Sequence, residues 1–285
     1  MHFNRQKLKP RSKLTICPNK KRTKIKNISP PPLNKNKKTK RRINTKNKYV
    51  RNIKDVKVNR SIKSKNFLYD HKKYKALNEW KNILKGEPAF LLGNGLSISK
   101  QNLSLLNSYF TLGMNRIFYL YEPTVLIWQD IELWKTNKND ILGLKSIRVC
   151  RDVSDPRKYF LNFKLAQDPY LFKKRPEYLH GRGNTGGITT QFAVALGCSC
   201  VVFLGMDCKY GLKGQTDFYG INKDHKEYTL SMCRKTMKWL NKHCPIPIYN
   251  CSNIDIWPKR KLEDVIKELK PNKYSRRYFQ RLFSK

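Results

Sequence analysis

Long hydrophobic runs are missing from this 285-residue chain, and their absence limits what the protein can be. No stretch approaches the roughly 18 apolar residues that a membrane-spanning helix needs. The N-terminus also lacks the apolar segment of a secretory signal peptide, and its many Lys, Asn and Pro residues argue against an amphipathic targeting helix. We therefore expect a cytoplasmic protein without a transmembrane segment.

Regular cysteine spacing is missing as well. The eight cysteines include no Cys-x-x-Cys pair, and several of them lie within apolar runs. Zinc sites and disulfide frameworks depend on such spacing, so the sequence predicts buried, reduced thiols and no structural metal site.

Several catalytic and nucleotide-binding signatures are also absent. The chain has no Gly-x-x-x-x-Gly-Lys-Ser/Thr loop, no Gly-x-Ser-x-Gly elbow and no His-Glu-x-x-His motif. The turn after the first predicted strand, Gly93-Asn94-Gly95, continues as Leu96-Ser97-Ile98 and so does not form a Gly-x-Gly-x-x-Gly fingerprint. An Asp-x-Asp pair, which would hold a metal-bound sugar nucleotide, is missing too. The protein is therefore no ordinary P-loop NTPase, and we expect chemistry that does not depend on a cofactor or a metal held by the protein.

Positive charge is abundant and unevenly distributed. Residues 1–65 hold 24 of the 61 Lys and Arg residues and a single acid, Asp55, so this segment carries about +23 of the formal +41. Apolar residues are sparse there, which predicts a disordered basic arm. The arm could bind nucleic acid, an anionic membrane surface or an acidic partner, or be a solvated tail in a Lys-rich proteome. The sequence leaves both interpretations open.

Residues 86–258 alternate short apolar runs with helical segments, which is typical of a single α/β domain with a Rossmann-like, doubly wound, mainly parallel sheet. Strands are expected at Ala89–Leu92, Phe110–Met114, Val125–Trp128, Ser146–Cys150, Cys200–Leu204 and Ile246–Asn250, and helices at Lys100–Asn107, Thr189–Leu196 and Lys226–Asn241. An amphipathic helix over 66–85 is expected to lead into the domain. A long insertion or lid occupies 152–183, and a basic C-terminal helix and tail covers 259–285.

Polar residues follow several of these strands, at the edge where an open α/β sheet binds its ligand. The first apolar run ends in a Gly-Asn-Gly turn, whose glycines let a ligand approach the backbone and whose following helix offers free N–H groups. A simple strand-to-helix link is the alternative for this turn. The candidates for one nucleotide pocket are Gly93, Asn94, Gly95, Ser97, Asn115, Asp130 and Asp207.

Two further loops carry candidate binding and catalytic groups. In the glycine-rich loop after His180, the side chain of Arg182 and the helix start at Asn184, Thr185 and Gly186 could hold a phosphate or carboxylate, although a flexible linker is the alternative. Beyond the strand Cys200–Leu204, the candidates are Tyr210, Tyr219 and His225. Two tyrosines could position a leaving phosphate and the histidine could act as an acid or base, or simply be an exposed loop residue.

In their order and spacing, these motifs resemble those of the family 42 sialyltransferases. They are equally similar to the motility-associated-factor glycosyltransferases and the archaeal 6-hydroxymethylpterin pyrophosphokinases. The resemblance lies within about residues 86–258 and rests on Leu92–Ser97, Thr111–Arg116, Asn184–Gly186 and Phe203–Asp207. Leu96 departs from the usual Pro, and the segment between Tyr219 and His225 is short, which leaves donor and acceptor undefined.

The resemblance implies a Rossmann-like domain that binds a nucleotide-activated donor. In the sialyltransferase branch it implies that Asn94 and Asn115 contact the nucleotide and that Thr185-Gly186 holds a donor phosphate or carboxylate. It further implies that tyrosines, here Tyr210 and Tyr219, stabilise the leaving phosphate, and that a histidine, here His225, is the general base.

Three functions follow as hypotheses. The first is transfer of a sugar, such as a nonulosonate, from a nucleotide-sugar to the hydroxyl of an unknown acceptor. The second is pyrophosphate transfer from ATP, with Mg²⁺ held by carboxylates such as Asp130 and Asp207. The third is a degenerate nucleotide-binding fold that acts as a nucleic-acid-binding or scaffold protein through residues 1–65.

Overall fold

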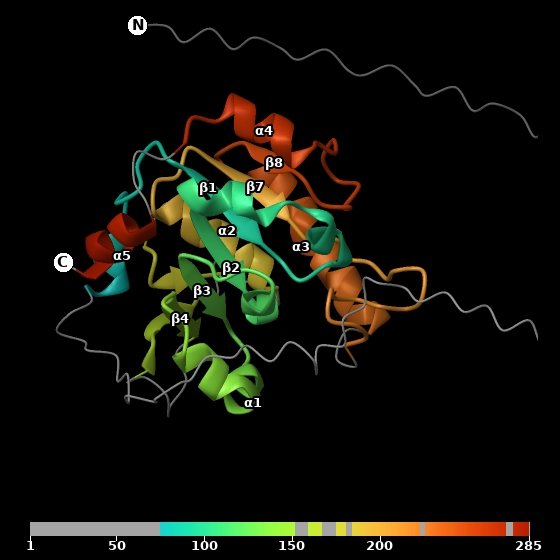
Figure 1. Cartoon of the computed structure of the whole chain (residues 1–285), viewed down its shortest axis with the longest axis horizontal. Coiled ribbons are helices and arrows are strands. Elements are labelled where there is room, and N and C mark those ends of the chain that lie inside the picture. Colours follow the sequence, from blue (N-terminus) through green and yellow to red (C-terminus); the bar gives the residue numbers. More distant parts are fainter. Residues whose placement is uncertain are drawn as a thin grey trace, which may run out of the picture. The chain divides into compact units, whose positions relative to one another are not determined.

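The computed structural model describes residues 75–151, 159–166, 175–180, 184–222, 226–271 and 276–284 (Figure 1). Within them, helices flank an eight-stranded sheet in the order β6-β5-β4-β3-β2-β1-β7-β8, and every neighbouring pair of strands is parallel. The predicted α/β fold with a doubly wound parallel sheet is confirmed. The predicted arm over 1–65 lies outside the described residues.

The described strands are β1 (Pro88–Leu92), β2 (Phe110–Met114), β3 (Val125–Trp128), β4 (Ile147–Arg151), β5 (Leu161–Leu165), β6 (Tyr178–Leu179), β7 (Cys200–Leu204) and β8 (Ile248–Asn250). All of them except β5 and β6 agree closely with strands predicted from apolar runs of the sequence. The α-helices are α1 (Ile131–Leu142), α2 (Thr185–Ala195), α3 (Glu227–His243), α4 (Leu262–Glu268) and α5 (Arg276–Ser284). Short 3-10 helices are η2 (Leu77–Trp80), η3 (Leu96–Lys100), η4 (Leu103–Ser108) and η5 (Asn115–Tyr119). None of the described helices is long and apolar enough to cross a membrane.

The sheet reverses its direction of growth between β1 and β7. From β1 the chain adds strands outward on one side up to β6, and after α2 it returns to place β7 against the other edge of β1. Such a reversal leaves a crevice beyond the carboxyl ends of the two central strands, where open α/β sheets bind ligands.

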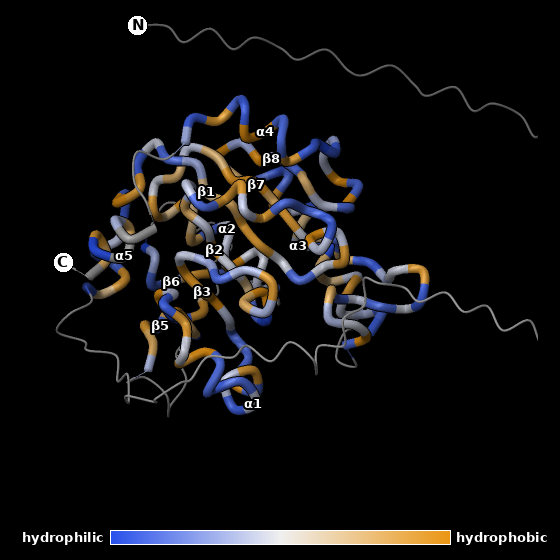
Figure 2. The backbone as a smooth tube through the Cα atoms, viewed as in Figure 1, coloured by the Kyte–Doolittle hydropathy of each residue, from blue (hydrophilic) through white to orange (hydrophobic). Residues whose placement is uncertain are grey.

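Both faces of the sheet are buried in hydrophobic layers. In β1, Ala89 and Leu91 point into one layer while Phe90 and Leu92 point into the other, as the two-residue period of a strand requires. The first layer includes side chains of α2, α3 and α5, and the second includes side chains of α1, η3 to η5 and α4. Figure 2 shows the apolar stretches gathered along the central strands, whereas polar stretches lie on the outer helices.

The helix predicted over 66–85 is wrong in the part that the structure describes. From residue 75 the chain forms the short η2 helix and turns instead. Asn82 adopts a left-handed conformation with φ of 60°, and the N–H groups of Asn82 and Leu84 donate to the carbonyls of Ala195 and Leu196. These backbone hydrogen bonds to the end of α2 replace the hydrogen bonds that a continuous helix would form within this segment.

The helix predicted at Lys100–Asn107 is likewise replaced by η3 and η4. The side-chain oxygen of Asn102 accepts hydrogen bonds from the backbone N–H of Ser104 (3.3 Å) and from its hydroxyl (2.7 Å). Asn and Ser side chains that bind nearby backbone in this way compete with helical hydrogen bonds, so the chain ends one helix and begins another.

Part of the predicted lid belongs to the sheet. β5 and β6 pair in parallel beyond β4, so the described residues of the 152–183 segment extend the sheet rather than cover a ligand. The α1 helix between β3 and β4 was not predicted, and α2 begins at Thr185, four residues before the predicted start.

The C-terminal residues are part of the core. The predicted tail contains α5, whose Phe279 and Phe283 are fully buried although the helix is rich in Arg. The ring centroid of Phe283 lies 4.1 Å from that of Trp80, and the ring centroid of Phe279 lies 5.2 Å from that of Phe110. These aromatic contacts join the last helix to η2 and to β2.

Replacing Phe283 with Ala is expected to lower the free energy of unfolding by about 3–5 kcal/mol, because it removes a fully buried ring from a packed core. Tyr278→Ala, on the same helix but 38% exposed, should cost less than about 1 kcal/mol. Urea unfolding of the full chain measures both values. A Phe283→Ala variant as stable as the wild type would show that α5 does not contribute to the core.

Candidate functional site

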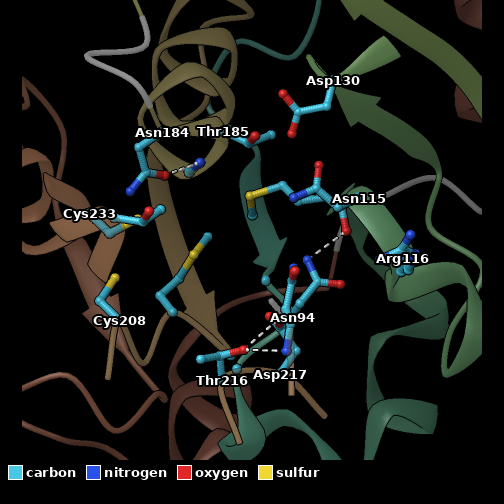
Figure 3. A pocket seen from close by; sticks show the side chains of 18 of the residues that line it. Asn94, Asn115, Arg116, Asp130, Asn184, Thr185, Cys208, Thr216, Asp217 and Cys233 are labelled. Carbon is cyan, nitrogen blue, oxygen red and sulfur yellow. Dashed lines mark hydrogen bonds between the residues drawn. The ribbon is translucent and has the colours of Figure 1, made fainter. Parts of the chain in front are cut away.

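A cleft of about 610 Å³ lies beyond the carboxyl ends of the central strands (Figure 3). Ten of the predicted site residues line it: Gly93, Asn94, Gly95, Asn115, Asp130, Asn184, Thr185, Gly186, Asp207 and Tyr219. These residues come from strand ends and loops far apart in the sequence. The tertiary structure therefore brings most of the predicted site together.

The glycines of the first turn serve the packing of two strand ends. The N–H of Gly93 donates to the carbonyl of Leu204 and the N–H of Gly95 to that of Gly205, each over 2.8 Å. A Cβ on Gly93 would lie 2.4 Å from the Gly205 oxygen, and one on Gly95 would lie 2.7 Å from the carboxylate of Asp207. These two N–H groups are thus already bonded, so the expected backbone cradle for a phosphate is not formed by them.

Asp207 braces the rim of the cleft. Its Oδ2 accepts the backbone N–H of Ser97 over 2.8 Å, and its Oδ1 accepts the Ser97 hydroxyl over 2.5 Å and the N–H of Asn253 over 2.9 Å. Asp207 and Ser97 are both buried, and Ser97 does not line the cleft. The carboxylate that was expected to face a ligand instead ties η3 and the loop after β8 to the end of β7.

Two carboxamides supply the unpaired acceptors of the cleft. Asn94 donates its Nδ2 to the carbonyl of Met114 over 3.1 Å, and Asn115 adopts a left-handed conformation with φ of 49°. The Oδ1 atoms of both side chains are buried, and neither has a hydrogen-bond partner among the residues that the structure describes. A buried acceptor without a partner costs free energy. Both oxygens are therefore suited to accept bonds from a ligand in the cleft.

The α2 helix begins at the cleft. The side chain of Asn184 caps it by accepting the N–H of Gly186 over 2.6 Å, and the Thr185 hydroxyl accepts a bond from Nε2 of Gln129 over 3.1 Å. The first turn of a helix leaves N–H groups without helical partners and carries the positive end of the helix dipole. This wall of the cleft is therefore suited to an anionic group.

Among the tyrosines that the structure describes, Tyr219 lines the cleft. Burial, and secondly the charge of Asp217, raise its pKa to about 12, so the phenol is protonated at neutral pH. The guanidinium carbon of Arg116 lies 5.4 Å from the centre of the ring, and Asn222 contacts the phenol oxygen over 3.5 Å. A neutral O–H donor beside a cation can bind an anionic oxygen.

The remaining predicted residues are placed differently or are not described. Tyr210 is 42% exposed and does not line the cleft. Arg182 and His225 lie outside the described residues. Asp130 lines the cleft as the exposed residue before α1, and its side chain makes no capping bond to that helix.

Sequence reasoning missed several polar residues of the cleft, and three of them, Arg116, Gln129 and Arg151, follow predicted strands. Each lies at the end of a predicted strand or within two residues of it, so its position along the chain was a usable signal. Within the described part of the chain, no cluster of three or more His, Cys, Asp or Glu residues could hold a metal ion.

Two solved structures, both of the sialyltransferase CstII from Campylobacter jejuni, show a partial likeness to this chain. The complex with the substrate analogue cytidine-5'-monophosphate has 16% identity and a TM-score of 0.38, covering 58% of this chain and 80% of that one. The complex with CMP-3FNeuAc has 13% identity and a TM-score of 0.30, covering 57% and 79%. Values this low do not establish a shared activity. No protein-family model and no curated protein matches the chain.

Asp207→Asn is expected to lower the free energy of unfolding by about 1–3 kcal/mol with no ligand present, because an amide NH₂ would face an N–H or O–H donor in a buried site. Asp255→Asn, which changes an exposed partner of Arg234, is the matched control and should cost less. Urea unfolding measures both losses. Unchanged stability of Asp207→Asn would contradict the bracing role.

Proposed function

We propose that the protein is a glycosyltransferase that moves a sugar from a nucleotide-sugar donor to an acceptor hydroxyl. The observation that carries the proposal is the pair of buried, unpaired oxygens of Asn94 and Asn115 in a cleft at the reversal point of the sheet. The resemblance of the surrounding motifs to those of nucleotide-sugar transferases supports the same assignment. A nonulosonate is the sugar class that this resemblance favours.

In this proposal the two carboxamides bind the nucleoside. Their oxygens accept hydrogen bonds from ribose hydroxyls or base N–H groups, which pairs atoms that the protein itself leaves unpaired. The diphosphate, phosphate or carboxylate portion of the donor lies at the start of α2, against Thr185 and Gly186, with Arg116 supplying positive charge.

In the transfer step, Tyr219 and His225 have different roles. The bond between the sugar and the phosphate oxygen breaks while a bond to the acceptor oxygen forms. The protonated phenol of Tyr219 donates to the departing phosphate oxygen, where negative charge develops. His225 is the proposed base that takes the proton of the acceptor hydroxyl. This mechanism gives Tyr210 no contact with the donor.

Pyrophosphate transfer from ATP is a weaker proposal. Magnesium was expected between Asp130 and Asp207, but both oxygens of Asp207 already accept hydrogen bonds from within the protein. Asp207 therefore does not fit the role of a metal ligand, and Asp130 is the carboxylate that fits. The binding of nucleic acid, an anionic membrane surface or an acidic partner by residues 1–65 stays a prediction, because that segment is outside the described residues.

Asn94→Ala is expected to weaken nucleotide binding about tenfold or more, since it removes a buried acceptor that the ligand would satisfy. A thermal-shift screen with CMP-, UDP- and GDP-sugars and ATP, with and without Mg²⁺, identifies the ligand and measures the loss. A hundredfold excess over the dissociation constant stabilises the wild type by about 2.7 kcal/mol.

The control for this screen is Asn102→Ala, an exposed capping residue outside the cleft, which should keep the wild-type shift. Equal shifts for Asn94→Ala and the wild type would remove Asn94 from the binding site. A shift with ATP that requires Mg²⁺, and none with any sugar nucleotide, would favour the pyrophosphokinase instead.

Tyr219→Phe is expected to lower kcat about 100-fold with little change in KM, because the lost O–H bond forms mainly as the phosphate departs. Tyr210→Phe makes the same chemical change outside the cleft and should keep near wild-type kcat. Steady-state kinetics with the donor found by the screen measure both variants. A larger loss in Tyr210→Phe than in Tyr219→Phe would reverse the assignment.

A further inference from the structure

Two thiols meet in the wall of the cleft. Cys208 follows the end of β7 and Cys233 lies in α3, and both are half-buried and line the cleft. Figure 3 shows them on the same side of the cleft, beneath the start of α2. A side-chain hydrogen bond links Cys208 with Cys233, so the two thiols are neighbours.

The backbone at Cys208 supports this contact. Cys208 adopts a left-handed conformation with φ of 50°, which is uncommon for a residue other than glycine, Asn or Asp. The turn comes directly after Asp207, whose carboxylate is held by Ser97 and Asn253. The hydrogen bonds of Asp207 therefore hold the residue directly before Cys208 in place, which keeps Cys208 opposite α3.

The other described cysteines lack this arrangement. Cys150, Cys198, Cys200 and Cys251 are buried, and Cys244 lies half-buried at the end of α3. None of them lines the cleft. Burial raises the pKa of Cys150 to about 12 and those of Cys244 and Cys251 to about 11.

The surroundings of Cys208 act on its pKa in opposite directions. The hydrogen bond to Cys233, and secondly burial, raise the pKa of Cys208, whereas the positive charge of Arg234, the residue after Cys233, lowers it. The net effect raises this pKa, so the Cys208 thiol keeps its proton at neutral pH. We therefore assign the first attack on an oxidant to Cys233 and the second to Cys208.

We propose that Cys208 and Cys233 form a redox modification site that a peroxide converts to a disulfide. The Cys233 thiolate attacks one oxygen of hydrogen peroxide, the O–O bond breaks, and the released hydroxide takes up a proton to leave as water. The resulting sulfenic acid is attacked by the sulfur of Cys208, which forms the S–S bond. The displaced hydroxide takes the Cys208 proton and leaves as a second water.

The bonds and electrons of this oxidation balance. Two S–H bonds and one O–O bond are broken, one S–S bond and two water molecules form, and two electrons pass from the cysteines to the peroxide. The new bond would join α3 to the loop after β7. Because both segments line the cleft, the modification would tie two of its walls together.

The test is a thiol count and a cross-link map of the full chain. Reduced protein is treated in the native state with one equivalent of hydrogen peroxide, then unfolded, alkylated and digested for mass spectrometry. We expect two of the eight thiols to disappear, a peptide linked through Cys208 and Cys233, and complete recovery of the thiols with a phosphine reductant. The oxidised protein should also unfold at a higher temperature than the reduced protein, because the link restricts the unfolded chain.

Cys233→Ser should abolish both the linked peptide and the thermal shift, whereas Cys244→Ser, at the residue that caps the end of the same helix, should keep them. Should Cys233→Ser fold poorly, the cross-link map of the wild type still decides the matter. A count that stays at eight, or a link that pairs Cys233 with a cysteine other than Cys208, would overturn the proposal. Counting thiols requires no donor or acceptor, so the result is independent of the proposed transferase activity.

Discussion

The close approach of two strand ends, those of β1 and β7, is the constraint on which the rest of the structure depends. Gly93 and Gly205 lie so close that a single added Cβ at Gly93 would reach the opposing carbonyl. Directly beyond this contact, Asp207 binds Ser97 and Asn253 in a buried network. The contact and the network hold the two strand ends together at the point where the sheet reverses its direction of growth.

Because the two strand ends are packed together in this way, side chains rather than backbone N–H groups of the turn are available to a ligand. Because the N–H groups of Gly93 and Gly95 are bonded to β7 and to the residue that follows it, the turn between them holds Asn94 in place instead of cradling an anion. The Nδ2 of Asn94 donates a hydrogen bond to the carbonyl of Met114, and its Oδ1 is left available to a ligand in the cleft. Pre-organised polar groups of this kind lower the cost of binding, because neither the side chain nor its neighbours must be ordered again.

The central strands could be predicted because strands buried on both faces are short, continuous apolar runs, as at Val125–Trp128 and Cys200–Leu204. Helices were less predictable. The lead-in helix fails because Asn82 donates its N–H to the end of α2, a contact that no local pattern reveals. The α5 helix was taken for a basic tail because its many Arg residues hide the spacing of its two buried Phe side chains.

The sequence by itself determined the fold class, the edge of the sheet that holds the cleft, and the position of Asn94 and Asn115 at that edge, because strand ends and the polar residues after them are local patterns. Tertiary structure alone decided what each polar group does. Asp207, Tyr210 and Tyr219 are equally plausible binding residues when only the sequence is known. In the folded chain, the Asp207 carboxylate already accepts hydrogen bonds from Ser97, and Tyr210 lies outside the cleft. Hydrogen-bond partners and neighbours from distant segments exist only in the folded chain. The same reason explains why the spacing of the cysteines in the sequence does not reveal that Cys208 and Cys233 are neighbours.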